Sequence, residues 1–273
     1  MTCKTGQILF LRKNFIDLQK PNVDITVTDS VALNNGQNSV DFLRNRNNIS
    51  AWQTTESSDA ANTVLLIEMF DFQDVDFIQL VKHNFKDYLI EWRDNLDVWN
   101  EYVNVVGSST DTSIHEQLIA VCTNTIRITI YNTKEADDDK ELRQLIITEK
   151  QFRFEGWPVV KKPKHSQNRK ENKMLSGKSR FVTSRGAFST ELEIKLTGND
   201  HDLEMHEDIY YQAEGLLLLI SGGKEDQFRT QRKGYRNEDI VLVKVADEYS
   251  NPYDKGIYSN GIKIKMKLKE SVD

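Results

Sequence analysis

Apolar residues recur at every second position in several stretches of the chain. The stretch VDITVTD (23–29) alternates in this way, as do TNTIRITIYNT (123–133) and NGIKIKMKLKE (260–270). A period of two is that of a half-buried β-strand. NTVLLIEM (62–69) and DFIQLVKHNFKDYLIEW (76–92) are rich in aromatic and β-branched residues and have no sustained helical period. We therefore predict strands there too.

The second half of the chain predicts more strands and one helix. SRFVTSRGAFSTELEIKL (179–196) predicts two strands about a turn at Arg185 and Gly186. NDHDLEMHEDIYYQAEG (199–215) has a capping residue, acids in its first turn and a closing glycine, which predict a helix. DIVLVKVAD (239–247) then predicts a further strand.

A change of composition divides the chain. LRQLIITE (142–149) predicts the last strand of the first half, and residues 161–180 then carry eight Lys or Arg against the single acid Glu171. We place a domain boundary near residue 150, with domains at 1–150 and 151–273. The fold class expected is mainly β, an N-terminal β-sandwich followed by a second β-sandwich-type domain with one α-helix.

The size and charge of the chain limit the classes of protein to which it can belong. At 273 residues and 31.6 kDa the chain is long enough for two domains. A net charge of -6 disfavours a general nucleic-acid binder, which needs a basic surface. Cys3 and Cys122 are too few for a disulfide framework. The opening MTCKTGQILFLRKNF has no signal-peptide pattern, and no apolar run is long enough to predict a membrane span.

Candidate catalytic residues do not form a motif. His83 could serve as a base or simply end a strand, and His201 and His206 are five apart, which predicts two surface histidines rather than a zinc pair. The acidic run 137–139 predicts a solvated turn, and SGGKEDQF (221–228) lacks the spacing of a phosphate loop. We therefore expect no enzyme, no cofactor and no metal site.

The stretch RNRNNISAWQT (44–54) groups two arginines, three asparagines and a tryptophan. Two interpretations are open. It is a loop that reads a ligand through Arg44, Arg46 and Trp52, or it is a corner by which the chain enters a β-sandwich, with Trp52 packed beneath it.

The strand order of the first half resembles that of a known family. NNISAWQTTESSDAANTVLLIEMFDFQDVDFIQLVKHNFKDYLIEW and TIRITIYNTKEADDDKELRQLIITE resemble a discoidin-like domain, a β-sandwich of the galactose-binding jelly-roll type. In that family a loop with a tryptophan precedes an apolar strand, and a late strand carries an arginine between apolar residues. Trp52, residues 64–69 and Arg127 match this order. The resemblance covers about residues 8–149 and implies a jelly-roll sandwich.

The second half resembles the sandwich-plus-helix domains of tail-tube and distal-tail rings, and the order of parts resembles a structural protein of a tailed-phage or prophage virion. This resemblance implies a tail or baseplate component in the virion, assembled in the bacterial host cytoplasm as a ring with other copies of itself and neighbouring tail proteins. It also implies that the first domain binds a host-surface glycan. The alternative is a stand-alone carbohydrate-binding module. We expect no membrane or nucleic-acid partner in either case.

Overall fold

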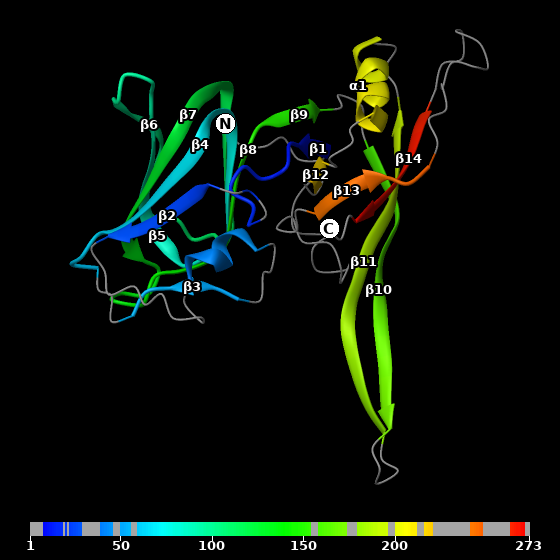
Figure 1. Cartoon of the computed structure of the whole chain (residues 1–273), viewed down its shortest axis with the longest axis horizontal. Helices are drawn as coiled ribbons and strands as arrows, with labels where there is room; N and C mark the ends of the chain where they lie inside the picture. The colour runs from blue at the N-terminus through cyan, green and yellow to red at the C-terminus, as the bar shows by residue number, and fades with distance from the viewer. Residues whose placement is uncertain are drawn as a thin grey trace. The chain divides into compact units, whose positions relative to one another are not determined.

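The computed structural model describes residues 8–18, 20, 22–28, 39–45, 50–55, 59–153, 158–173, 179–195, 200–211, 216–220, 241–247 and 263–270. The chain divides into two compact units (Figure 1). The first unit is Asn14–Lys150, and the second combines Thr2–Lys13 with Gln151–Asp273. The described residues are mostly in antiparallel strands with one α-helix, which confirms the expected fold class. None of the described helices is long and apolar enough to cross a membrane.

The first unit contains seven strands and a short 3-10 helix in its described residues. These are β2 (Val23–Thr28), η1 (Val40–Arg44), β3 (Trp52–Gln53), β4 (Thr63–His83), β5 (Phe85–Arg93), β6 (Trp99–Val105), β7 (Ser113–Thr133) and β8 (Glu141–Thr148). Hydrogen bonding follows the order β3-β8-β4-β7-β5-β6, with β2 also paired to β4. The alternating stretches are strands, as predicted, over residues 23–28 and 123–133.

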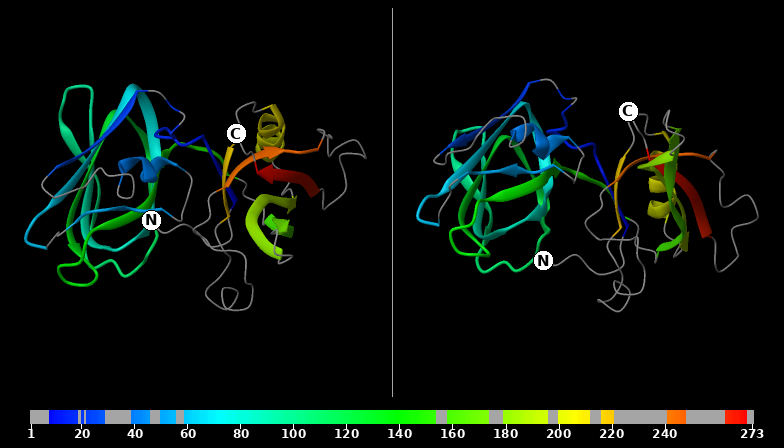
Figure 2. Two further views of the ribbon diagram at one scale, coloured as in Figure 1. Left: turned by 60° about the horizontal axis from the view of Figure 1, so that its bottom comes forward. Right: turned by 90° about the horizontal axis from the view of Figure 1, so that it is seen from below.

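Two long strands build a sandwich from this single path of hydrogen bonds. β4 and β7 pair along most of their length, with breaks in register between Glu68 and Gln73 and between Val75 and Phe77. Before the breaks, β4 lies between β2 and β7, and β7 continues the layer to β5. Beyond them, β4 pairs with β8. Each long strand therefore serves both layers, which face each other (Figure 2).

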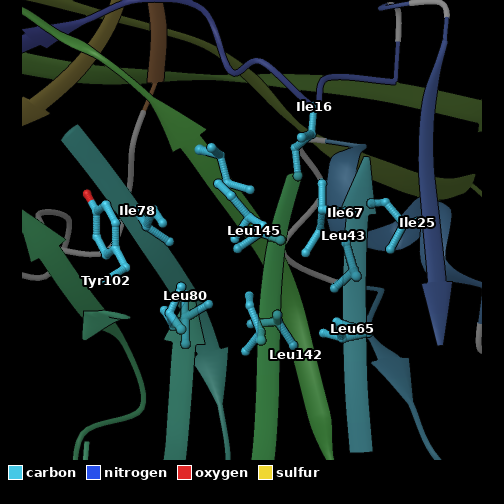
Figure 3. Close-up of a cluster of buried hydrophobic side chains, with 14 of the residues drawn as sticks. Ile16, Ile25, Leu43, Leu65, Ile67, Ile78, Leu80, Tyr102, Leu142 and Leu145 are labelled. Carbon is cyan, nitrogen blue, oxygen red and sulfur yellow. The ribbon is translucent and has the colours of Figure 1, made fainter. Parts of the chain in front are cut away.

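The core of the first unit lies between these layers. Ile67 from the first half of β4 and Ile78 from its second half are both fully buried in one cluster with Leu145 of β8 (Figure 3). In the first half of β4 and the second half of β7, buried residues alternate with more exposed ones, which supplies the apolar face of one layer. Residues 75–81 of β4 are instead buried without a break.

The second unit is a seven-stranded antiparallel sheet with one helix. Its elements are β1 (Ile8–Leu11), β9 (Lys150–Arg153), β10 (Pro158–Lys173), β11 (Ser179–Lys195), α1 (Asp200–Tyr211), β12 (Leu216–Ile220), β13 (Val241–Val245) and β14 (Lys263–Glu270). The strand order is β10-β11-β14-β13-β12-β1-β9. The N-terminal strand β1 pairs with β12, so the chain starts in the second unit before it forms the first. The predicted domains, 1–150 as a discoidin-like sandwich and 151–273 as a tail-tube- or distal-tail-like domain, stay predictions.

The helix closes the core of the second unit. Met205 and Ile209 of α1 are buried in a cluster with Met266 and Leu268 of β14, whose alternate lysines are exposed as predicted. His206 is only 2% exposed, so the expectation of a surface histidine there is wrong. The acids Glu204, Glu207 and Asp208 lie on the exposed side of α1, whereas Met205, His206 and Ile209 form its buried face. The side chain of His201 lies outside the described residues.

The predicted turn at Arg185 and Gly186 is also wrong. Both residues lie inside β11, which pairs with β10 from Lys173↔Ser179 to Pro158↔Ile194. The register shifts between His165 and Gln167, opposite Gly186. Glycine in a strand often marks such an irregularity rather than a turn. The basic stretch noted at 161–180 contributes residues 161–173 to β10, one strand of a long hairpin that extends beyond the other strands of its sheet (Figure 1).

Candidate functional site

Arg44, one of the three predicted ligand residues, is held by backbone carbonyls. It ends η1 and is 9% exposed. Its Nη1 donates to the carbonyl of Val23 at 3.0 Å, and its Nη2 donates to those of Lys20 at 3.2 Å and Asp17 at 3.4 Å. The guanidinium therefore joins η1 to the segment that leads into β2.

Trp52 is fully buried in the core of the first unit. Its strand β3 pairs with β8, through Trp52↔Leu142, and its Nε1 has no hydrogen-bond partner among the described residues. This placement agrees with the packing interpretation. Arg46 lies outside the described residues. The structure thus brings no exposed ligand site together from the described members of this set, and their ligand role stays a prediction for binding experiments.

His83 and Ser113 have the geometry of a nucleophile and base but the wrong proton arrangement. His83 Nδ1 accepts a hydrogen bond from the Phe85 amide at 3.1 Å, and its Nε2 lies 2.9 Å from Ser113 Oγ. Burial, followed by the charge of Lys134, lowers the pKa of His83 to about 3, so the ring is neutral near pH 7. With Nδ1 accepting, Nε2 carries the only ring proton and donates to Ser113. It cannot accept a proton from that serine.

The other candidate residues for proton or metal chemistry also make hydrogen bonds within the first unit. Burial lowers the pKa of His115 to about 4, and its Nε2 lies 3.0 Å from the hydroxyl of Tyr88. The acidic run 137–139 lies in the loop between β7 and β8, as predicted, where the Asp137 amide donates to Asp59 Oδ2 at 3.3 Å. Among the described residues, no group of three or more His, Cys, Asp or Glu side chains could hold a metal ion.

A different group of side chains forms a cluster on the outer face of the first unit. Trp99 opens β6 and is partly exposed. The guanidinium carbon of Arg127 lies 4.1 Å from the centroid of the Trp99 ring, and that of Arg93 lies 5.9 Å away. We call Trp99, Arg93, Arg127 and Glu91 the Trp99 site.

Strand register positions these four residues. Glu91 is opposite Arg127, and Arg93 is opposite Trp99. Arg127 donates from Nε at 2.8 Å to Glu91 Oε2, and its Nη2 is 2.7 Å from the same oxygen. The buried neighbours Ile90, Ile126 and Ile128 point into the sandwich, so alternation places the charged residues on the opposite face. The ion pair fixes Arg127 against the indole.

The turn between β5 and β6 holds Trp99 in place. Asp94 Oδ1 accepts from the amides of Leu96 at 2.8 Å and Val98 at 2.9 Å, and Asp94 Oδ2 accepts from Asn100 Nδ2 at 3.3 Å. The hydrogen bonds from these groups lower the pKa of Asp94. Leu96 and Val98 are exposed beside this ordered turn. The hydrogen bonds of Asp94 therefore order the turn on either side of Trp99 and so fix the position of its indole ring.

The Trp99 site combines an aromatic ring with charged hydrogen-bonding groups that are fixed in position. Such rings bind partly apolar molecules through their faces, while guanidinium and carboxylate groups make strong, directional hydrogen bonds. Sequence reasoning missed this site, because Trp92 and Trp99 lie in similar surroundings in EWRDNLDVWNEY. Only the strand register shows that Trp99 meets Arg127 on the outer face.

Comparisons with known proteins add likenesses to solved structures. No family model matches the chain, and no curated protein matches it. The module CpGH89CBM32-6 of Clostridium perfringens has 15% sequence identity, a TM-score of 0.40 and coverage of 50% of this chain and 99% of its own. A family 32 carbohydrate-binding module from NanJ of the same organism, in complex with galactose, has 14% identity, a TM-score of 0.40 and coverage of 46% and 93%.

A family 32 carbohydrate-binding module from Streptococcus pneumoniae EndoD has 14% identity, a TM-score of 0.40 and coverage of 50% of this chain and 99% of its own. These three are carbohydrate-binding modules, and none is a virion protein. The expected tail or baseplate role, ring partners and virion location therefore stay predictions. Because the identities and TM-scores are low, the functional proposal rests on the contacts of this chain's own side chains.

Proposed function

We propose that the first unit is a non-catalytic carbohydrate-binding module and that the Trp99 site holds the sugar. The observation that carries the proposal is the stack of Trp99 on Arg127, with Arg127 in turn fixed by Glu91. A fixed aromatic ring and a fixed ion pair on an outer face form a surface on which a small amphipathic molecule can settle without rearranging the protein.

A sugar ring suits this combination of groups. One side of a pyranose exposes C–H groups that pack on an indole, while its edge exposes neighbouring hydroxyls. The hydroxyls can donate to Glu91 and accept from Arg127 or Arg93, which would make charge-assisted hydrogen bonds. The ordered Asp94 turn lowers the entropic cost of binding because Trp99 is already in position.

The affinity expected for one sugar ring is modest. The site lies on a partly exposed face, where water competes for every hydrogen bond. We therefore expect a Kd of about 0.1–1 mM for a monosaccharide and tighter binding of an oligosaccharide that also contacts Leu96 and Val98.

The proposal is tested by a glycan array on the full chain, followed by calorimetry with the best sugar. Trp99→Ala is expected to weaken binding at least tenfold while the chain stays folded. Tyr211→Ala is the matched control, because it removes a 72% exposed aromatic side chain from α1 in the second unit. It should bind as the unchanged protein does.

Two outcomes would overturn the proposal. One is an array without a reproducible hit. The other is a Trp99→Ala variant of unchanged affinity. If Arg44→Ala or Arg46→Ala abolished binding in a folded chain instead, the site would move to the stretch 44–54 that the sequence predicted.

A further inference from the structure

Exposed apolar side chains lie on both strands where β4 and β7 pass from one layer of the first unit to the other. Phe70 and Phe72 of β4 are 73% and 47% exposed, and Leu118 and Ile119 of β7 are 83% and 82% exposed. We call these four residues the bend surface. They flank the pairs Gln73↔Thr123 and Val75↔Val121, next to the breaks in register. Large apolar side chains exposed along one paired stretch of a folded domain favour an interaction surface there.

The charge around the bend surface is negative. Residues 68–76 and 116–123 contain five carboxylates and no Lys or Arg. Lys150 Nζ lies 3.6 Å from Asp76 Oδ2 and 3.8 Å from Glu116 Oε2. Its charge therefore compensates these two part-buried carboxylates. Glu68, Asp71 and Asp74 are exposed beside the apolar residues. Such a surface repels phosphate groups of membranes and nucleic acids, and it favours a partner that is basic and partly apolar.

The hairpin of β10 and β11 has this complementary chemistry. Residues 158–173 and 179–188 contain eight Lys or Arg and one acid, together with valine and phenylalanine residues. β11 pairs with β14 only over Ser189–Lys195, so its residues 179–188 pair only with β10 in the part of the chain that is described. A two-stranded ribbon is marginally stable alone and leaves backbone groups at its edges. We call residues 158–173 and 179–188 the ribbon.

We propose that the bend surface of one copy of the chain binds the ribbon of a second copy. Charge supports this choice of partner. The segment 14–150 contains 11 Lys and Arg and 23 Asp and Glu, a net charge of -12, whereas the rest of the chain carries +6. Attraction between copies through opposite charges then brings the exposed apolar groups of the bend surface out of water. The contact uses no residue of the Trp99 site and does not depend on sugar binding.

The first test measures the mass of the full chain by sedimentation and light scattering over a concentration series. Association should strengthen with concentration and weaken as salt screens the charges. Asp71→Lys with Asp74→Lys, and separately Arg169→Glu with Lys170→Glu, should each weaken association at least tenfold. An equimolar mixture of the two variants should associate again, because a reversed bend surface meets a reversed ribbon. Glu204→Lys with Glu207→Lys on the exposed side of α1 is the control and should change nothing.

The second test locates the contact through Cys122, which is exposed and pairs across the ladder with Asp74. In a Cys3→Ser background, a short crosslinker from cysteine to lysine should join Cys122 to Lys164, Lys170 or Lys173. Mixing copies with light and heavy nitrogen should give crosslinks between a light and a heavy chain.

The proposal fails if the chain is a monomer at every concentration or if both reversed variants associate normally. It also fails if all crosslinks join residues of the same copy. If reversal of the ribbon abolishes binding of a DNA duplex while reversal of the bend surface has no effect on self-association, the ribbon is a nucleic-acid contact instead.

Discussion

The two units differ in charge and in how their cores are closed. The first has a net charge of -12 over residues 14–150 and buries its core between two layers of strands. The second carries +6 and buries its core between one sheet and α1. A sandwich encloses both apolar faces, so buried polar groups such as Arg44 and His83 must find partners inside it. A sheet with one helix can extend strands outward, as the ribbon does.

This contrast predicts that a core change acts on one unit alone. Trp52→Ala should lower the free energy of unfolding of the first unit by about 3–5 kcal/mol, because it removes a fully buried indole. Hydrogen exchange read by mass spectrometry, with denaturant added in steps, should show no change in β12 or β14. Trp99→Ala, at a partly exposed position, should cost less than about 1 kcal/mol. A Trp52→Ala chain of unchanged stability would contradict the packing role.

The period of two predicted β2, β14 and the second half of β7, and composition predicted further strands, but neither showed where the strands end or predicted β6 and β10. NTVLLIEM and the first part of DFIQLVKHNFKDYLIEW are one strand, β4, which continues through the exposed residues Phe70 and Phe72. A bend within a continuous strand leaves no proline or glycine signal. The pairing of β1 with β12 joins residues about 210 positions apart, and no local pattern encodes such a contact.

The site was predicted less well than the fold. Arginine and tryptophan in a short polar stretch suggested a ligand loop, but Trp52 is in the core and Arg44 binds carbonyls. Both residue types are used equally for packing and for recognition. Trp99 and Arg127 are 28 positions apart and meet only through the pairing of β5 with both β6 and β7. A sequence without contacts cannot reveal this.

The internal hydrogen bonds of the first unit give the next prediction. Arg44→Ala should destabilise that unit by about 2–3 kcal/mol, because three backbone carbonyls lose the donors that satisfy them. Chemical denaturation followed by circular dichroism measures the change. Lys86→Ala removes another cation from the same unit, at an exposed position, and should stay within about 0.5 kcal/mol. Equal effects of the two changes would show that charge, rather than the carbonyl contacts, matters.

Acid should weaken the first unit more than the second. Burial lowers the pKa of His83 to about 3 and that of His115 to about 4 in the first unit, and that of His206 to about 4 in the second. Because the unfolded chain takes up a proton near pH 6.5, stability is complete above that pH and falls toward the folded pKa. We expect a loss on the order of 1–2 kcal/mol per histidine between pH 7 and 5.

Urea midpoints measured from pH 7.5 to 5 should test this slope. His83→Gln should reduce the dependence of the first unit's stability on pH, since glutamine does not titrate. Asp76 acts in the opposite direction, because burial raises its pKa and favours the folded state as the carboxyl takes up a proton. A stability that is independent of pH in this range would contradict the neutral, buried state of these histidines.

The smallest expected effect concerns how α1 is tied to the second sheet. The hydroxyl of Tyr210 donates to Asp247 Oδ1 at 2.9 Å, and Asp247 also accepts from the Lys267 amide at 3.2 Å. Tyr210→Phe should lower the stability of the second unit by about 1 kcal/mol and leave the first unchanged. Tyr211→Phe, next to it but 72% exposed, is the matched control and should have no measurable effect on unfolding. Both changes remove one hydroxyl oxygen from neighbouring residues, so the difference between their effects on the free energy of unfolding measures the Tyr210–Asp247 hydrogen bond. Equal effects would show that the helix is held by its apolar face alone.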